Sequence, residues 1–320
     1  MLYRSRDELF ALYDDLVSSH RLIATKSIIG TTVEGRSIPM YKFGNLQGGK
    51  ILLDSTIHGE EDMGGEIFLL YARWILESTD PDAIAIRNGN CTMIIPCLNV
   101  DRYDIGTGEG YGRRNAHDVD LSRNFTYRWE ASTDKYKGPS PASEPETQAL
   151  INIFKNEKPI FYLNSHNGDR AYFAVYSDNS SRRTYAQQVY SKIVAEAQKR
   201  GIVTYGLSLN TAYNNPGLAV CDADLEGINS FLIEWDCWTT TPSDPLTDCN
   251  WVGHPAKPPF SSIQNYYFPR WLPIGIVWSR ECAIPREWYP GYYIRWLLDR
   301  ISGRDFLENF PIMAKQEHKT

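Results

Sequence analysis

A histidine and a glutamate, His58 and Glu61, follow directly behind an apolar run at residues 51–57. The run is typical of a buried strand, and a helix is predicted to begin near residue 62. Neutral imidazole and carboxylate are both good zinc ligands, and a separation of three positions on the turn between these elements lets both side chains point at one spot. The pair therefore predicts part of a metal site at the end of a strand.

A second histidine, His166, has the same setting, because it follows a β-prone run at residues 161–165. In open α/β sheets the carboxyl ends of neighbouring strands share one edge, and ligands bind there. We therefore expect His58, Glu61 and His166 to meet as the three protein ligands of one metal ion, with a fourth position left for water. A packed or solvated histidine is the alternative at either histidine position.

A late carboxylate, Glu234, stands inside the apolar run at residues 231–235. A carboxylate in a strand is costly unless it is paired, exposed at the strand end or used in chemistry. A glutamate of an edge strand that faces solvent is the plain alternative. Glu234 is therefore a candidate catalytic residue.

Two further segments separate the histidines. Residues 113–125 read RRNAHDVDLSRNF, and residues 143–147 read SEPET. The order of HxxE, an arginine before VDLxRNF, SEPET, a lone histidine after a strand and a late glutamate resembles the zinc carboxypeptidase family of the carboxypeptidase A type. The resemblance runs from Thr25 to Trp235. It implies a zinc-carboxypeptidase-like fold, hydrolase activity and one Zn²⁺ per chain.

The resemblance also implies roles for the matching metal and acid–base residues. His58, Glu61 and His166 match the family's zinc ligands. Glu234 matches the general base, which takes a proton from the zinc-activated water and passes it to the leaving amine.

The arginines and one serine match positions that contact the substrate. Arg113 matches the arginine that polarises the scissile carbonyl and stabilises the oxyanion, and the adjacent Arg114 is the alternative for that role. Arg123 matches the arginine that binds the substrate's free carboxylate through paired hydrogen bonds. Ser122 stands where the family commonly has asparagine, so we expect a weaker or differently shaped carboxylate clamp and less strict C-terminal action.

Two more features concern substrate selection. Tyr213 lies near the position of the family's mobile substrate-capping tyrosine. Residues 219–224, which include two aspartates, fall where the family lines its side-chain pocket. These aspartates are expected either to favour a basic or amine-bearing group, such as lysine, arginine or diaminopimelate, or to be exposed carboxylates at a helix start.

The implied function is that of a zinc-dependent metallocarboxypeptidase, a protease that hydrolyses a peptide bond near a free carboxylate through a metal-activated water. A peptidoglycan stem-peptide hydrolase and an N-acyl amino acid deacylase are the alternatives within the same superfamily. The expected substrate is therefore a peptide or a peptidoglycan-type molecule. A non-catalytic binding protein on a peptidase scaffold is the alternative of another class, and the presence of every ligand and of the base disfavours it.

Strand-like and helix-like apolar patterns alternate along the chain. They predict an α/β fold of three layers, in which helices sandwich a mixed, mostly parallel sheet. The 320 residues are long enough for a single zinc peptidase domain, with an aromatic-rich C-terminal extension at residues 236–320 packed on it. Strands are expected at residues 38–43, 51–57, 91–98, 159–165 and 230–235, and helices at residues 6–17, 64–76, 144–154, 184–197 and 289–301.

Most of the tryptophans lie late in the chain, from Trp235 to Trp296. Such aromatic residues form either core or an aromatic-walled cleft that holds a glycan or peptide. We favour core, because a long irregular region needs large apolar side chains beneath it.

Composition excludes several classes of partner. A net charge of −6, a pI near 5.6 and the lack of a basic cluster argue against nucleic acid. No apolar stretch approaches the roughly 20 residues of a membrane span. The N-terminus lacks the apolar core of a secretory signal, so we expect a cytoplasmic protein, or a secreted one if a leader has been removed. The six cysteines show no metal-ligand spacing and are expected to be reduced, mostly buried thiols.

Overall fold

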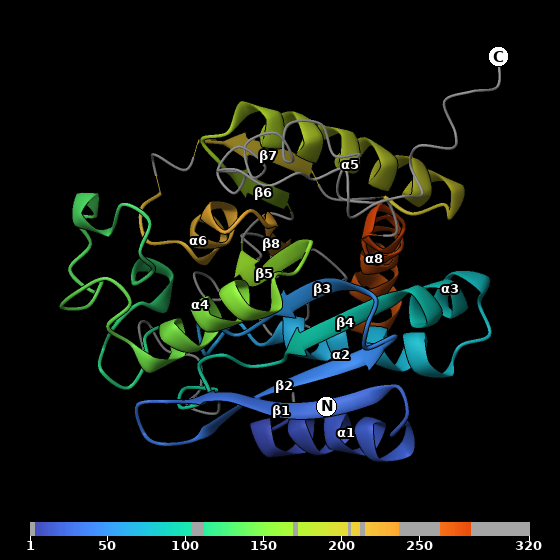
Figure 1. The fold of residues 1–320 in the computed structure, drawn as a ribbon, viewed down its shortest axis with the longest axis horizontal. Helices are drawn as coiled ribbons and strands as arrows, with labels where there is room; N and C mark the ends of the chain where they lie inside the picture. The colour runs from blue at the N-terminus through green and yellow to red at the C-terminus, as the bar shows by residue number, and fades with distance from the viewer. Residues whose placement is uncertain are drawn as a thin grey trace, which may run out of the picture. The chain divides into compact units, whose positions relative to one another are not determined.

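An eight-stranded mixed sheet forms the middle of the molecule (Figure 1). The computed structural model describes residues 4–103, 112–168, 172–203, 206–211, 215–236 and 263–282. The strand order is β1-β2-β4-β3-β5-β8-β6-β7. The strands are β1 (Ala24–Thr31), β2 (Ser37–Gly44), β3 (Gly49–Asp54), β4 (Asn90–Ile95), β5 (Phe161–Gly168), β6 (Tyr172–Tyr176), β7 (Gly206–Asn210) and β8 (Asn229–Asp236).

The centre of this sheet is parallel. Strands β4, β3, β5 and β8 lie side by side in parallel ladders, whereas β1, β2 and β6 join through antiparallel ones and β7 pairs parallel to β6. Residues 51–54 of β3 are all buried, as expected for a central parallel strand that is covered on both faces. The predicted mixed, mostly parallel sheet is confirmed.

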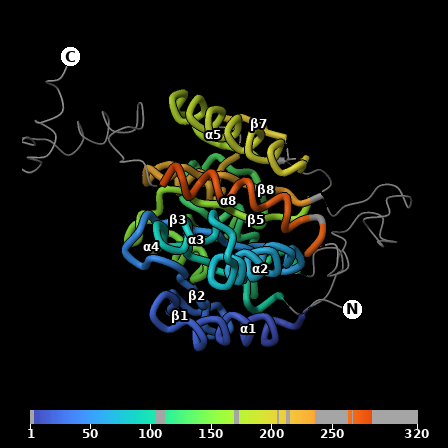
Figure 2. Tube along the Cα trace, turned by 90° about the vertical axis from the view of Figure 1, so that its right-hand side faces the viewer, coloured from blue at the N-terminus to red at the C-terminus, as the bar shows by residue number. Residues whose placement is uncertain are grey.

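Helices cover both faces of the sheet, which confirms the three predicted layers (Figure 2). Helices α1, α2, α3, α5 and α8 lie on the face turned to the viewer in Figure 2, and α4 and α6 cover the opposite face, which is on the left in Figure 1. The helices are α1 (Arg6–Ser19), α2 (Met63–Glu77), α3 (Pro81–Gly89), α4 (Pro145–Glu157), α5 (Ser180–Lys199), α6 (Ala219–Leu225) and α8 (Phe268–Cys282). Short helical turns occur at Leu121–Arg123, Trp129–Ala131 and Ile263–Tyr267.

Local signals explain where the predicted elements begin and end. Ser5 and Glu8 form a capping box at the start of α1. β3 stops at Asp54, three residues earlier than predicted, because residues 55–57 leave the ladder and Thr56 has a positive φ of 61°. β5 continues to Gly168, so His166 lies inside the strand rather than after it. The predicted helix at residues 289–301 lies outside the described residues.

The described part of the aromatic-rich C-terminal segment belongs to the core. Trp271 and Trp278 of α8 are fully buried, as are Trp235 and Tyr267. The Trp278 ring stacks on Phe161 of β5, with ring centroids 5.1 Å apart. These aromatic side chains fill the space between the sheet and its helices, as the core interpretation predicts. Residues 237–262 and 283–320 of the predicted extension lie outside the described residues.

No helix in the described ranges is both long and apolar enough to cross a bilayer. The described cysteines are buried thiols, as predicted. They are Cys91, Cys97, Cys221 and Cys282.

Candidate metal centre

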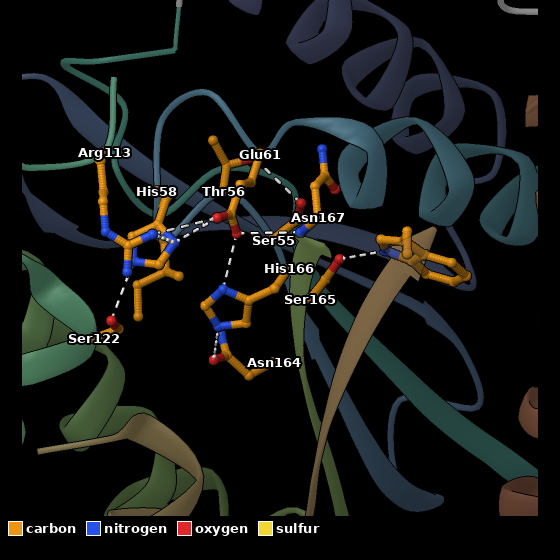
Figure 3. A network of polar contacts seen from close by, with 12 residues as sticks. Ser55, Thr56, His58, Glu61, Arg113, Ser122, Asn164, Ser165, His166 and Asn167 are labelled. Atoms are coloured by element: carbon orange, nitrogen blue, oxygen red, sulfur yellow. Dashed lines mark hydrogen bonds and ion pairs between the residues drawn. The ribbon is translucent and has the colours of Figure 1, made fainter. Parts of the chain in front are cut away.

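Three side chains converge at the carboxyl ends of β3 and β5 (Figure 3). The Glu61 carboxylate lies 2.8 Å from His58 Nδ1 through one oxygen and 2.8 Å from His166 Nδ1 through the other. All three side chains are buried, and one ligand atom from each lies within 4.8 Å of the others. The structure therefore brings together the three residues that the sequence predicts as ligands.

Close packing at the start of α2 brings Glu61 to His166. The turn between β3 and α2 is closed by the Glu61 amide, which donates to the His58 carbonyl oxygen at 3.0 Å. A Cβ at Gly64 would lie only 2.2 Å from Ser165 Oγ. Because glycine has no side chain, the first turn of α2 can press against β5, and the two separate strand ends can share one site.

Each histidine is held through its outer nitrogen. His58 Nε2 lies 3.1 Å from Asp120 Oδ1, and His166 Nε2 lies 2.7 Å from Asn164 Oδ1. Asn164 in turn donates from Nδ2 to both carboxylate oxygens of the buried Asp54, at 3.1 and 3.2 Å. Acceptors at Nε2 keep a proton on that atom, so Nδ1 is the nitrogen that faces Glu61 and would bind a metal ion.

This donor set fits a zinc ion. Two imidazole nitrogens and one carboxylate oxygen are a common ligand set of catalytic zinc, with the fourth position open. The three ligand atoms lie within 4.8 Å of one another, close enough for one ion to bind all three. The outer partners of both histidines are of the kind that orients metal-bound imidazoles.

The carboxylates in this cluster stabilise the positive charge of one histidine. Burial by itself would lower the pKa of His58, but the Glu61 and Asp120 carboxylates raise it to about 9 against the opposing charge of Arg113. Burial would likewise raise the pKa of Glu61, but both histidines hold it far below its usual range. In the metal-free protein His58 is therefore protonated at neutral pH, and Nδ1, the nitrogen that would bind a metal ion, carries one of its two protons.

Glu234 faces the same cavity from the neighbouring strand. It pairs with His166 in the parallel register of β5 and β8. Burial, together with the nearby Glu61, raises its pKa to about 7, while His166 opposes this shift. A Cβ at Gly168 would lie 2.5 Å from the Glu234 carboxylate, so the glycine two residues after His166 keeps space for it. Together these residues line a cavity of about 420 Å³.

Arg113, rather than Arg114, points toward the candidate ligands (Figure 3). Its Nε donates to Asp120 Oδ2 at 3.0 Å, and its Nη1 lies 3.6 Å from the Glu61 carboxylate. Arg114 instead stacks over the Tyr136 ring at 3.9 Å. Asp120 thus bonds both to a candidate ligand and to the arginine beside it.

Ser122 and Arg123 also line the cavity. The Ser122 hydroxyl donates its proton to Asp120 Oδ1 at 2.6 Å and accepts from Arg123 Nη1 at 3.0 Å. A hydroxyl has a single proton to donate. Because Asp120 accepts that proton, Ser122 has none to donate to a substrate, and Arg123 is the donor that remains for the predicted carboxylate clamp.

The SEPET segment anchors the loop that carries Arg113. The buried Glu144 carboxylate accepts from Asn115 Nδ2 at 2.7 Å and lies 2.8 Å from His117 Nδ1. Glu146 accepts a second bond from Asn115 at 3.1 Å. The motif therefore acts on the site through loop position rather than through contact with the cavity.

The interpretation of the aspartates in residues 219–224 as exposed carboxylates is wrong. Asp222 is buried and accepts from the amides of Thr126 and Tyr127 at 3.0 and 2.7 Å. Asp224 pairs with Arg182. Neither aspartate is among the described residues that line the cavity, because both carboxylates are used to fasten neighbouring segments.

The structure adds cavity residues that the sequence did not indicate. Leu218 and Leu232 contribute apolar surface, and Tyr176 and Asn215 contribute polar side chains. No sequence pattern distinguishes these four from other loop and strand residues. The predicted substrate-capping residue, Tyr213, lies outside the described residues.

An α/β sandwich with a two-histidine, one-glutamate cluster at its sheet edge is the arrangement that the sequence resemblance predicts. The family model described as zinc carboxypeptidase matches residues 9–233. The chain therefore belongs to the zinc carboxypeptidase family, and the predicted resemblance is confirmed.

Similar curated proteins are distant in sequence. Carboxypeptidase D of Drosophila melanogaster is 27% identical over 177 residues, which are 51% of this chain and 12% of that protein. The human carboxypeptidase N catalytic chain is 26% identical over 193 residues, which are 49% of this chain and 42% of that protein. The chain thus matches less than half the length of these relatives.

Solved structures show the same fold. Bovine thrombin-activatable fibrinolysis inhibitor superimposes with a TM-score of 0.68 at 19% identity, covering 88% of this chain and 97% of that one. Carboxypeptidase A from Helicoverpa armigera has a TM-score of 0.67 at 20% identity, covering 89% of this chain and 74% of that one. At these identities the likeness establishes the fold alone.

Proposed function

We propose that this chain is a zinc-dependent metallocarboxypeptidase, which hydrolyses the peptide bond next to a free terminal carboxylate. One observation carries the proposal: a single cavity is lined by the three candidate ligands, by Glu234 and by two arginines. A zinc ion bound to His58, Glu61 and His166 would supply a Lewis acid and an activated water. The other side chains supply proton transfer and substrate binding.

Glu234 would move the protons. Its pKa of about 7 suits a group that must accept a proton from water and release it again at neutral pH. The proton would pass to the nitrogen of the leaving residue, so one carboxylate serves first as base and then as acid. Its pairing with His166 in the sheet supports this role, because the base then lies next to the metal site.

The two arginines would bind different parts of the substrate. Arg113 is oriented by Asp120 and faces the candidate ligands, where an oxyanion would develop. A donor in that position contributes about 3–4 kcal/mol to transition-state stabilisation. Arg123 would bind the terminal carboxylate, a task that suits a planar guanidinium.

Metal content and a matched pair of peptides test this proposal. We expect one zinc per chain and cleavage of a peptide with a free C-terminal carboxylate, but not of the same peptide with an amidated C-terminus. Zinc with cleavage of amidated, stem-peptide or N-acyl amino acid substrates would favour the peptidoglycan hydrolase or deacylase alternative. A protein with neither zinc nor turnover would favour a binding scaffold.

Glu234→Gln tests the proton-transfer role. Gln keeps the size of the side chain but cannot accept the proton, so we expect kcat to fall by about 10²–10⁴-fold. Zinc content should stay at the wild-type level, as measured on the same preparation. Glu226→Gln, an exposed glutamate after α6, is the control. Near-normal kcat in Glu234→Gln would exclude this mechanism.

A further inference from the structure

A second cavity, of about 470 Å³, adjoins the first at Arg123. Arg123 and Asn215 line both cavities, so the two share a wall. The other residues of the second cavity come from the segment 128–134 and from Pro216, and none of them is a candidate metal ligand. The second cavity therefore lies next to the place where a terminal carboxylate would bind, and no candidate metal ligand lines it.

The lining of this second cavity is polar and cationic. Arg123, Arg128 and Asp134 are its charged lining residues, and Arg128 also hydrogen-bonds to the Tyr127 hydroxyl. Asp134 reaches Arg123 only at 3.7 Å, in a pair whose two side chains are 33% and 34% exposed. Exposed pairs of this length are weak, so a ligand carboxylate can compete for the arginine. Guanidinium groups bind carboxylates in a planar, two-bonded geometry.

The backbone around Arg128 is tightly fastened. Arg128 has a left-handed conformation, with a φ of 51°, which is uncommon for a residue other than glycine. Asp222 holds the preceding turn through the amides of Thr126 and Tyr127, and Gly217 bonds to Tyr127 across the gap. The backbone that carries Arg128 is thus fixed before a ligand binds, which lowers the entropic cost of binding.

We propose that this second cavity binds an additional carboxylate on the leaving-group side of the substrate. The inference rests on the proposed carboxypeptidase function, because Arg123 would bind the terminal carboxylate and Arg128 the second one. This second carboxylate is the acidic side chain of the residue that leaves.

Kinetics on a pair of peptides test this assignment. Acyl-Phe-Glu and acyl-Phe-Gln both end in a free carboxylate and differ by one side-chain charge at nearly equal size. We expect acyl-Phe-Glu to have a kcat/KM about tenfold higher, as for one hydrogen bond to a charged group. Equal kcat/KM values for the two peptides would overturn the proposal.

Two substitutions of opposite sign test the assignment to this cavity. Arg128→Gln removes the positive charge but leaves a polar side chain, and should reduce the charged-to-neutral preference toward one. Asp134→Asn removes the opposing charge and should increase that preference about threefold. A purely structural role of Arg128 would weaken activity on acyl-Phe-Glu and acyl-Phe-Gln alike, and that result would overturn the proposal. Arg73→Gln, on the exposed side of α2, is the matched control.

Equilibrium binding separates failure of this inference from failure of the proposed function. If the zinc-loaded protein cleaves none of the peptides, the carboxypeptidase proposal fails. Calorimetry with glutarate, a dicarboxylate, and butyrate, its monocarboxylate counterpart, still tests the cavity. Tighter binding of glutarate that is lost in Arg128→Gln would support the site, and equal binding of the two would overturn it.

Discussion

The strand ends and the arginine-bearing segment 112–134 hold charged side chains around one cavity by different means. His58, Glu61 and His166 are 2%, 4% and 5% exposed, and the backbone positions them: β5 carries His166, and the turn between β3 and α2 carries His58 and Glu61. The side chains of Arg113 and Arg123 are 37% and 33% exposed, and side-chain hydrogen bonds orient them. The backbone thus positions the candidate metal ligands, whereas side-chain contacts position the arginines that would bind the substrate.

The two regions meet at Asp120. One carboxylate oxygen bonds to His58 and the other to Arg113. The pKa of Asp120 lies well below its usual range, because His58 and the arginines outweigh the cost of burial. The two regions otherwise contribute different side chains, so changes in each region should affect different measured quantities.

Arg113→Gln should produce the largest effect in the arginine-bearing segment. Loss of a charged donor to the oxyanion should lower kcat by about 10²–10³-fold. Zinc content should not change, because Arg113 is not a candidate ligand. Steady-state kinetics and metal analysis on one preparation check both expectations.

Arg114→Gln is the control for this variant, because Arg114 packs on Tyr136 away from the cavity. A larger loss of kcat in Arg114→Gln than in Arg113→Gln would reverse the assignment of the two arginines. Loss of zinc from Arg113→Gln would mean that the two regions are not separable.

The strand ends could be predicted from the sequence because His58 and His166 follow apolar runs and Glu234 interrupts one. That pattern identified His58, His166 and Glu234, and the structure places all three at one cavity. Asn164 was missed because its pairing with His166 depends on the pleat of β5, in which alternate residues share a face. Gly168 was missed because its role is to leave space for a side chain of another strand.

The aspartates of α6 show why carboxylate roles in loops resist prediction. Asp222 and Asp224 read as pocket residues or exposed caps, but Asp222 bonds to amides almost a hundred residues earlier in the chain. Edge strands and α8 were missed for related reasons. β1 has a largely exposed pattern without alternation, and α8 contains Pro273, which ordinarily argues against a helix interior.

Zinc affinity should depend on pH through His58. The pKa of His58 is about 9 in the metal-free protein, so zinc must displace a proton from it at lower pH. The affinity should rise about tenfold per pH unit from pH 7 and level off near pH 9, roughly 100-fold in all. Calorimetry in buffers of different ionisation enthalpy should show about one proton released per zinc at pH 7. A flat affinity without proton release would contradict the assignment of His58 as a ligand.

Asn164→Ala should have the smallest of these effects and tests how the strand end orients His166. Without the amide oxygen, His166 loses the acceptor that keeps Nδ1 directed at the metal, so zinc affinity should fall about 10–100-fold. Substrate preference between acyl-Phe-Glu and acyl-Phe-Gln should not change, because the arginines are untouched. Circular dichroism checks that the variant folds despite the buried Asp54, and Asn45→Ala, in an exposed turn, is the control. A change in substrate preference with unchanged zinc affinity would contradict the conclusion that the strand ends determine zinc binding and the arginine-bearing segment determines substrate preference.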